Sequence, residues 1–289
     1  MKNILGTLLI VFGFFAASSS QELSREQKIQ NILDLRAQII SLENEILKPE
    51  TNDLNVAQTQ GLDVIRLMPR EKYDRVLAIN GGGSYYSFVL KSQAYGQGSD
   101  IGLERGNLKV GFAGADYGFM ADLGPKSIAE AYDSAEMEFF RKYVPPIYEA
   151  DIRAEYQKLQ NYESNGLSFK SYLPAVVGHT YLLRSLNIDR SDILVVFRIL
   201  RTDADGSLII GWRSIETFKK PIMFYAPDAE LKAAIDKIIQ TNGFQNIVID
   251  VKDNMLIWRS RPSADEMHRF SIVLSANHIR YRGMDYSQR

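Results

Sequence analysis

The sequence predicts an α+β protein: an N-terminal amphipathic helix, a central antiparallel β-rich domain with helices, and a C-terminal αββαβ module. Three patterns predict it. Apolar residues recur at helical spacing near the N-terminus, β-prone runs alternate with glycine turns in the middle, and a helix–strand–strand–helix–strand order closes the chain. With 289 residues, 45% of them hydrophobic, the chain has ample material for a packed core.

Residues 1–20 predict a signal peptide. Lys2 supplies a positive start, residues 4–17 are mostly apolar, and small residues precede a cleavage point before Gln21. As a helix the apolar run would extend ~21 Å, short of the ~30 Å hydrocarbon core of a bilayer, which favours cleavage over an uncleaved anchor. We expect an exported protein, periplasmic or secreted or associated with the envelope, with no membrane-spanning segment after cleavage.

Residues 21–50 predict an amphipathic helix with a coiled-coil pattern. Ser24 and Gln27 have the spacing of a capping box at its start. Apolar residues occupy the a and d positions of a heptad, namely Ile32, Leu35, Ile39, Leu42 and Ile46. Two interpretations stay open: the helix pairs with another copy, or it docks on its own domain. The polar residues 50–60 predict a linker.

Residues 51–225 predict the central α+β domain. Tyr73–Asn80 is β-prone, and Gly81–Gly83 predicts a tight turn rather than a phosphate loop, because no helix and no Gly-Lys-Ser/Thr follows it. Residues 127–160 are helical in pattern. Ser191–Arg201 reads as a strand that is apolar on both faces. Such a strand must be covered on both sides, so we expect it at the centre of the core.

Residues 226–289 predict the αββαβ module. Asp228 is the expected N-cap of its first helix, and Asp253-Asn254 is the expected turn between two strands. A second helix is expected to begin after Ser263, and His278–Arg282 is expected to form the last strand.

Two motifs in the central region resemble a set of uncharacterised exported bacterial proteins. They are Gly111-Phe112-Ala113-Gly114-Ala115-Asp116 and Gly178-His179-Thr180-Tyr181-Leu182-Leu183-Arg184-Ser185. The resemblance covers roughly residues 80–215. It implies export from a bacterial cell and brings no assigned activity.

The C-terminal module resembles a BON domain, an αββαβ family of bacterial envelope and periplasmic proteins linked to phospholipid or membrane association. The resemblance rests on Asp228 with Leu231, and on the spacing of Val248 and Val251. This sequence departs from the family where Ser260-Arg261-Pro262 replaces a usual glycine. What the resemblance implies is association with a lipid surface.

Candidate catalytic residues are few. His179, Ser185 and Asp192 can be written as a triad, but no Gly-x-Ser-x-Gly motif accompanies them. Four acids lie near glycine turns, namely Asp100, Glu104, Asp116 and Asp122. A glycosidase needs two such carboxylates at a set separation, but scattered loop acids are more often solvated, which is the interpretation favoured here. Three histidines and no cysteine predict neither a metal site nor a cofactor, and the missing cysteines and Asn-x-Ser/Thr sequons favour a bacterial host.

Basic residues cluster locally at the C-terminal end. The candidates for contact with anionic lipid are Arg259, Arg261, Arg280 and Arg282. The whole chain has a net charge of −1, which predicts no nucleic-acid partner.

Taken together, these patterns predict a non-catalytic exported protein that binds an envelope protein, polymer or lipid. One alternative is an extracytoplasmic hydrolase with a site near His179 and Asp192. Another is a homo-oligomeric scaffold assembled through residues 21–50.

Overall fold

The computed structural model confirms the α+β class: 33% of the described residues are helical and 29% lie in strands. The described residues are 23–96, 98–112, 114–164 and 166–287. The predicted signal peptide, residues 1–20, therefore lies outside them. The chain divides into two compact units, residues 1–42 and 43–289, which are described separately below.

Helix α1, Arg25–Leu47, confirms the predicted N-terminal helix. The backbone N–H of Gln27 donates to Ser24 Oγ (3.2 Å), and the backbone N–H of Ser24 donates to Gln27 Oε1 (2.8 Å). This reciprocal pair is the expected capping box, which satisfies two amides at the start of the helix. The last turn, from Glu43, belongs to the second unit.

Residues 50–60 do not form the predicted linker. They contain helix α2, Thr51–Thr59. The backbone N–H of Glu50 donates to the carboxylate of Asp53, and Arg201 pairs with the same carboxylate at 2.9 Å. A cap and a tertiary ion pair thus stabilise this short helix. Its residues are mostly polar and do not show the regular apolar spacing that would predict a helix.

The strand predicted at Tyr73–Asn80 is also absent from the described residues. Helix α3, Arg70–Tyr73, and turns occupy this stretch. The Glu43 carboxylate accepts hydrogen bonds from the amides of Ala78 and Ile79, which therefore do not pair with a strand. The tight turn at Gly81–Gly83 is confirmed, since all three glycines have φ between +59° and +80°.

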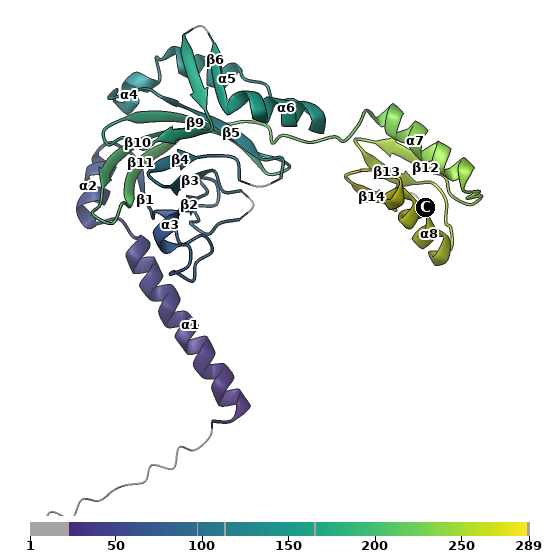
Figure 1. The fold of residues 1–289 in the computed structure, drawn as a ribbon, viewed down its shortest axis with the longest axis horizontal. Coiled ribbons are helices and arrows are strands. Elements are labelled where there is room, and N and C mark those ends of the chain that lie inside the picture. Colours follow the sequence, from purple (N-terminus) through teal and green to yellow (C-terminus); the bar gives the residue numbers. More distant parts are fainter. Residues whose placement is uncertain (1–22, 97, 113, 165, 288–289) are drawn as a thin grey trace, which may run out of the picture. The chain divides into compact units, whose positions relative to one another are not determined.

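Two antiparallel sheets form the central region (Figure 1). The larger sheet has the order β1-β11-β10-β9-β5-β7-β6. Its strands are β1 Asp63–Leu67, β5 Tyr117–Asp122, β6 Asn161–Ser164, β7 Leu167–Lys170, β9 Thr180–Asn187, β10 Ser191–Thr202 and β11 Leu208–Thr217. The smaller sheet has the order β2-β3-β4-β8. Its strands are β2 Tyr85–Tyr86, β3 Ile101–Glu104, β4 Asn107–Lys109 and β8 Tyr172–Pro174.

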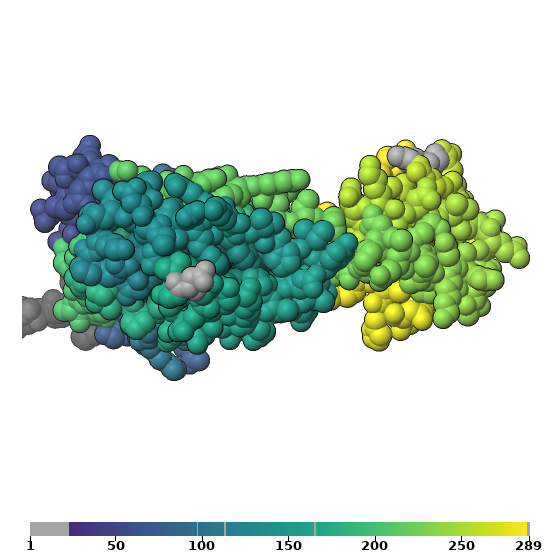
Figure 2. Space-filling view, turned by 90° about the horizontal axis from the view of Figure 1, so that it is seen from above, coloured from purple at the N-terminus to yellow at the C-terminus, as the bar shows by residue number. Residues whose placement is uncertain are grey.

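The larger sheet is covered on both faces, as the pattern of Ser191–Arg201 predicts. Tyr181 and Leu183 of β9 pack in a core shared with the smaller sheet. Leu182 and Leu186 of the same strand pack in a second core beneath three helices. The helices are α4 Ile128–Ala131, α5 Ala135–Lys142 and α6 Glu149–Leu159. Figure 2 shows this helical face in teal.

The C-terminal segment has the predicted order and its own hydrophobic core. Its elements are α7 Asp228–Thr241, β12 Ile249–Lys252, β13 Met255–Trp258, α8 Ala264–Ala276 and β14 Gly283–Asp285. Both residues of the predicted Asp253-Asn254 turn have positive φ, as a two-residue hairpin turn requires. Ser263 caps α8 as expected, through its hydroxyl.

Two details of that segment differ from the predictions. The last strand begins at Gly283, after the predicted His278–Arg282, and pairs with β13 in parallel. The N-cap of α7 is Pro227 rather than Asp228. The Asp228 carboxylate instead accepts the amides of Asp253 (2.7 Å) and Asn254 (2.8 Å), so it holds the hairpin turn.

Candidate functional site

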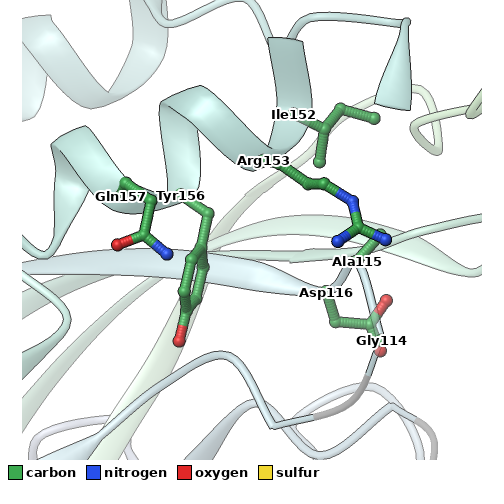
Figure 3. A pocket seen from close by; sticks show the side chains of 7 residues that line it. All are labelled: Gly114, Ala115, Asp116, Ile152, Arg153, Tyr156 and Gln157. Carbon is green, nitrogen blue, oxygen red and sulfur yellow. The ribbon is translucent and has the colours of Figure 1, made fainter. Parts of the chain in front are cut away.

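A cavity of about 360 Å³ lies between the loop that precedes β5 and helix α6 (Figure 3). The residues that line it are Gly114, Ala115, Asp116, Ile152, Arg153, Tyr156 and Gln157. The loop residues belong to the Gly111–Asp116 motif. The cavity combines an apolar wall with a few polar groups, which is the usual make-up of a small-molecule site.

Glycines of the motif shape this cavity. Gly111 has φ +77°, and a Cβ there would lie 3.3 Å from Cε2 of Tyr156 and 3.1 Å from Cα of Tyr117. A side chain at residue 111 would therefore strain the backbone and press on the Tyr156 ring. Gly114 turns the loop with φ +58°. The motif thus positions the aromatic ring on α6 as well as the carboxylate of Asp116.

Asp116 lines the cavity, and the protein engages one of its two carboxylate oxygens. Its Oδ1 accepts the amide of Ile188 at 2.7 Å, and no group in the described ranges bonds to its Oδ2. Burial raises the pKa of Asp116, against the lowering effects of the Ile188 amide and Arg190. This carboxyl is half-buried, so it is not the solvated loop acid that its position suggested.

The α6 side of the cavity supplies hydrogen-bond donors. Arg153 donates to Glu149 through Nε (3.2 Å) and Nη2 (2.7 Å), and no group in the described ranges accepts from its Nη1. Arg153 and Asp116 extend toward the same side of the cavity, and the Tyr156 ring points to the loop (Figure 3). Within the part of the chain that the structure describes, neither the Tyr156 hydroxyl nor the Gln157 amide has a protein partner.

His179 lies elsewhere, immediately before β9 of the larger sheet. Its Nδ1 is 3.0 Å from both carboxylate oxygens of Asp122, and both side chains are partly exposed. The pair forms because Asp122 ends β5 opposite Tyr181 on β9, two residues from His179. In the described residues, no hydroxyl group hydrogen-bonds to the His179 ring.

The structure does not bring Asp192 or Ser185 to His179. Asp192 is buried and both its oxygens accept from Arg184, at 2.5 Å from Nε and 2.8 Å from Nη2. The Arg184 guanidinium also stacks on the Phe218 ring at 3.3 Å. Ser185 donates to Asp100 at 2.6 Å.

Asp100 is wholly buried, which corrects its prediction as a solvated acid. Oδ1 accepts from Ser185 and from the Asn187 amide (2.8 Å). Oδ2 accepts from the backbone of Phe88 (2.7 Å) and from Ser87. Four donors meet this carboxyl, two from β9 of the larger sheet and two from the residues that follow β2 of the smaller sheet, so it links these two segments.

Arg259, Arg280 and Arg282, among the candidate lipid-contacting arginines, each lie beside a carboxylate. Arg259 bonds to Asp250 at 2.7 Å, Arg280 to Glu149 at 2.5 Å, and Arg282 to Asp189 at 2.6 Å. Arg261 is exposed. These pairs weaken the basic patch, because each positive charge lies beside a carboxylate.

No family model, curated protein or solved structure matches the chain. The resemblances to exported bacterial proteins and to BON domains therefore stay predictions. Among residues 23–287, apart from 97, 113 and 165, no group of three or more His, Asp or Glu side chains is placed to hold a metal ion. No helix in the same ranges is long and apolar enough to cross a membrane.

Proposed function

We propose that this chain is an exported, envelope-associated and non-catalytic binding protein, and that the cavity beside α6 is its ligand site. The observation that carries the proposal is the set of unengaged polar groups on Asp116, Tyr156 and Gln157 around one concave space. Protein groups that leave such capacity open in a cavity are available to a ligand.

The ligand class follows from the groups present. A carboxylate oxygen accepts, a guanidinium donates, and a phenol and an amide do both. The Tyr156 ring, Ile152 and Ala115 add apolar contact. A sugar unit offers neighbouring hydroxyls, and often an amide, around an apolar ring face. The polymer among the predicted envelope partners is thus the one that this cavity favours.

Several observations support binding rather than turnover. A hydrolase of the predicted kind needs a nucleophile, a base and a group that orients the base. Of the three predicted residues, Asp192 is neutralised by Arg184 and Ser185 is held by Asp100. The hydrolase alternative retains the His179–Asp122 pair, which resembles a base with its orienting group. If the protein hydrolyses a substrate and His179→Ala retains that activity in full, the hydrolase alternative with a site at His179 is wrong.

The export part of the proposal has its own test. The complete chain would be expressed in a bacterium, and the mass of the protein recovered from the periplasm or medium would be measured. Cleavage before Gln21 predicts the mass of residues 21–289. Retention of the full-length mass in the cytoplasm would contradict export.

The ligand site would be tested by calorimetry with soluble β-1,4-linked N-acetylglucosamine oligomers. Asp116→Asn and Tyr156→Phe each remove one cavity group and are expected to weaken binding about 10-fold, the value of one hydrogen bond of ~1.4 kcal/mol. Tyr162→Phe is the matched control, since Tyr162 does not line this cavity. No heat with any oligomer, or equal weakening by all three variants, would contradict the sugar site.

Vesicles containing anionic phospholipid form the second arm of the test. If the wild-type chain binds vesicles but not sugar oligomers, the ligand is the predicted lipid and not the polymer. Arg261→Ala should then weaken that binding, whereas Tyr156→Phe should leave it unchanged.

A further inference from the structure

Helix α1 carries a row of exposed apolar side chains along one side. Its members are Ile29, Ile32, Leu33, Leu35, Ile39, Ile40, Leu42 and Ile46, each between 41% and 59% exposed. Surface-exposed apolar residues are ordinary when scattered, but a stripe of eight along one helix marks an interaction site.

The opposite face of the helix is polar and partly closed by its own contacts. The Gln30 side-chain amide donates to Asp34 at 2.9 Å, one turn along. Such i,i+4 pairs stabilise a solvated helix face. One side of α1 is thus suited to water, and the other has no partner within the described residues.

The last turn of α1 shows that this stripe is separate from the contact with the helix's own chain. Glu43 and Leu47 are buried: the Glu43 carboxylate binds the backbone amide of Ile79 (3.0 Å), and Leu47 lies against Gly83. Leu42 and Ile46, their immediate neighbours, stay 59% and 41% exposed. Within the second unit, the buried Glu43 and Leu47 occupy e and b positions of the heptad, whereas Ile46, at an a position, stays exposed.

We infer that the stripe is covered by the same helix of a second copy of this chain, in a parallel two-stranded coiled coil. Isoleucine occupies the a positions, at residues 32, 39 and 46, and leucine occupies the d positions, at residues 35 and 42. β-branched residues at a with leucine at d favour two parallel strands, because each a or d side chain then packs against its equivalent.

This inference is independent of the proposed ligand site. Pairing joins two copies through α1 and places the two N-terminal ends side by side. Leu33 and Ile40 occupy b positions and lie outside the a/d seam, which e and g positions flank.

The absence of cysteine from the chain allows a direct test. In residues 21–289 of the otherwise unchanged protein, Leu35→Cys places a thiol at a d position. In a parallel in-register pair, two such thiols face each other within reach of a disulfide. Mild oxidation should convert this variant to a covalent dimer. Ala37→Cys is the matched control at the outward f position and should stay uncrosslinked.

Sedimentation equilibrium supplies the second measurement. The wild-type chain should show twice its single-chain mass in the upper part of a concentration series, and Ile39→Asp should return it to one chain with its circular dichroism otherwise retained. A single-chain mass throughout would overturn the proposal and favour docking on the chain itself. A two-chain mass without a Leu35→Cys crosslink would contradict the parallel arrangement of the two helices. Equal crosslinking of Leu35→Cys and Ala37→Cys would contradict the assignment of the contact to the a and d positions.

Discussion

Polar residues serve opposite purposes in two parts of the central region. In the interior, the carboxylates of Asp100 and Asp192 have both oxygens bonded to protein groups. In the cavity beside α6, neither the second carboxylate oxygen of Asp116 nor the Tyr156 hydroxyl has a partner in the described residues. Saturated groups hold a fold together, whereas open groups in a concavity are available to a ligand.

The contrast also separates the two kinds of mutational effect that we expect. Removing one member of a saturated buried pair leaves its partner charged or unpaired in a dry environment, which costs several kcal/mol. Removing an open cavity group leaves no such partner. Stability should therefore respond strongly in the interior and weakly in the cavity.

The largest expected effect is that of Arg184→Met. It leaves the Asp192 carboxylate buried without its cation, so the free energy of unfolding should fall by ~3–5 kcal/mol. Urea denaturation followed by circular dichroism would measure it. If the free energy of unfolding falls by less than an exposed ion pair contributes, the Arg184–Asp192 pair does not stabilise the interior as its hydrogen bonds indicate.

Two further variants sharpen this prediction. The double variant Arg184→Met with Asp192→Leu removes both charges and should recover much of the lost stability, because no unpaired charge remains. Arg141→Met removes an arginine whose pair with Glu216 (3.7 Å) is largely exposed, and should cost at most ~1 kcal/mol.

Sequence patterns predicted the elements whose signals are local. The two apolar faces of β10 follow from residues 193–197, and the β12–β13 turn follows from Asp253-Asn254. Helix α2 was missed because Asp53 is stabilised by Arg201, 148 residues further along the chain. Such a tertiary contact leaves no periodic pattern in the sequence.

The candidate site was predictable only in part. The Gly111–Asp116 motif marks the loop, but Tyr156 lies in the predicted helical stretch 127–160, whose pattern does not distinguish a cavity residue. The loop and helix meet only because α6 packs over β5. Similarly, His179 could not be matched to Asp122 from sequence, since their proximity depends on the register of β5 against β9.

The second prediction concerns pH and again sets the interior against the cavity. Burial is the main cause that raises the pKa of Asp100 above the ordinary 3.8, and the hydrogen bonds of Ser185, Phe88 and Asn187 oppose it. The folded protein then holds this proton at pH values where the unfolded chain has released it. Stability from Asp100 is therefore present below pH 3.8 and declines as pH rises through the raised folded value.

Asp100→Asn isolates this contribution. The wild type minus variant difference in unfolding free energy should fall with rising pH, by at most about 1.4 kcal/mol per pH unit between the two pKa values, and should then level off. Urea midpoints measured across that interval give the slope. Asp116→Asn is the comparison in the cavity, where partial exposure predicts a shallower slope. A difference for Asp100→Asn that rises with pH would mean that its hydrogen bonds outweigh burial.

The smallest expected effect uses one substitution in both regions. Tyr117 is buried and its hydroxyl bonds to that of Tyr143 at 2.8 Å, so Tyr117→Phe leaves a polar partner unmatched and should cost ~1 kcal/mol. Tyr156→Phe removes a hydroxyl that has no protein partner among the described residues, and should change stability by less than ~0.5 kcal/mol. Thermal unfolding of the two variants beside the wild type measures both changes. If Tyr156→Phe were the more destabilising of the two variants, the Tyr156 hydroxyl would stabilise the folded protein. The proposed contrast between hydrogen-bonded interior groups and unbonded cavity groups would then be wrong for Tyr156, the residue that supports it most.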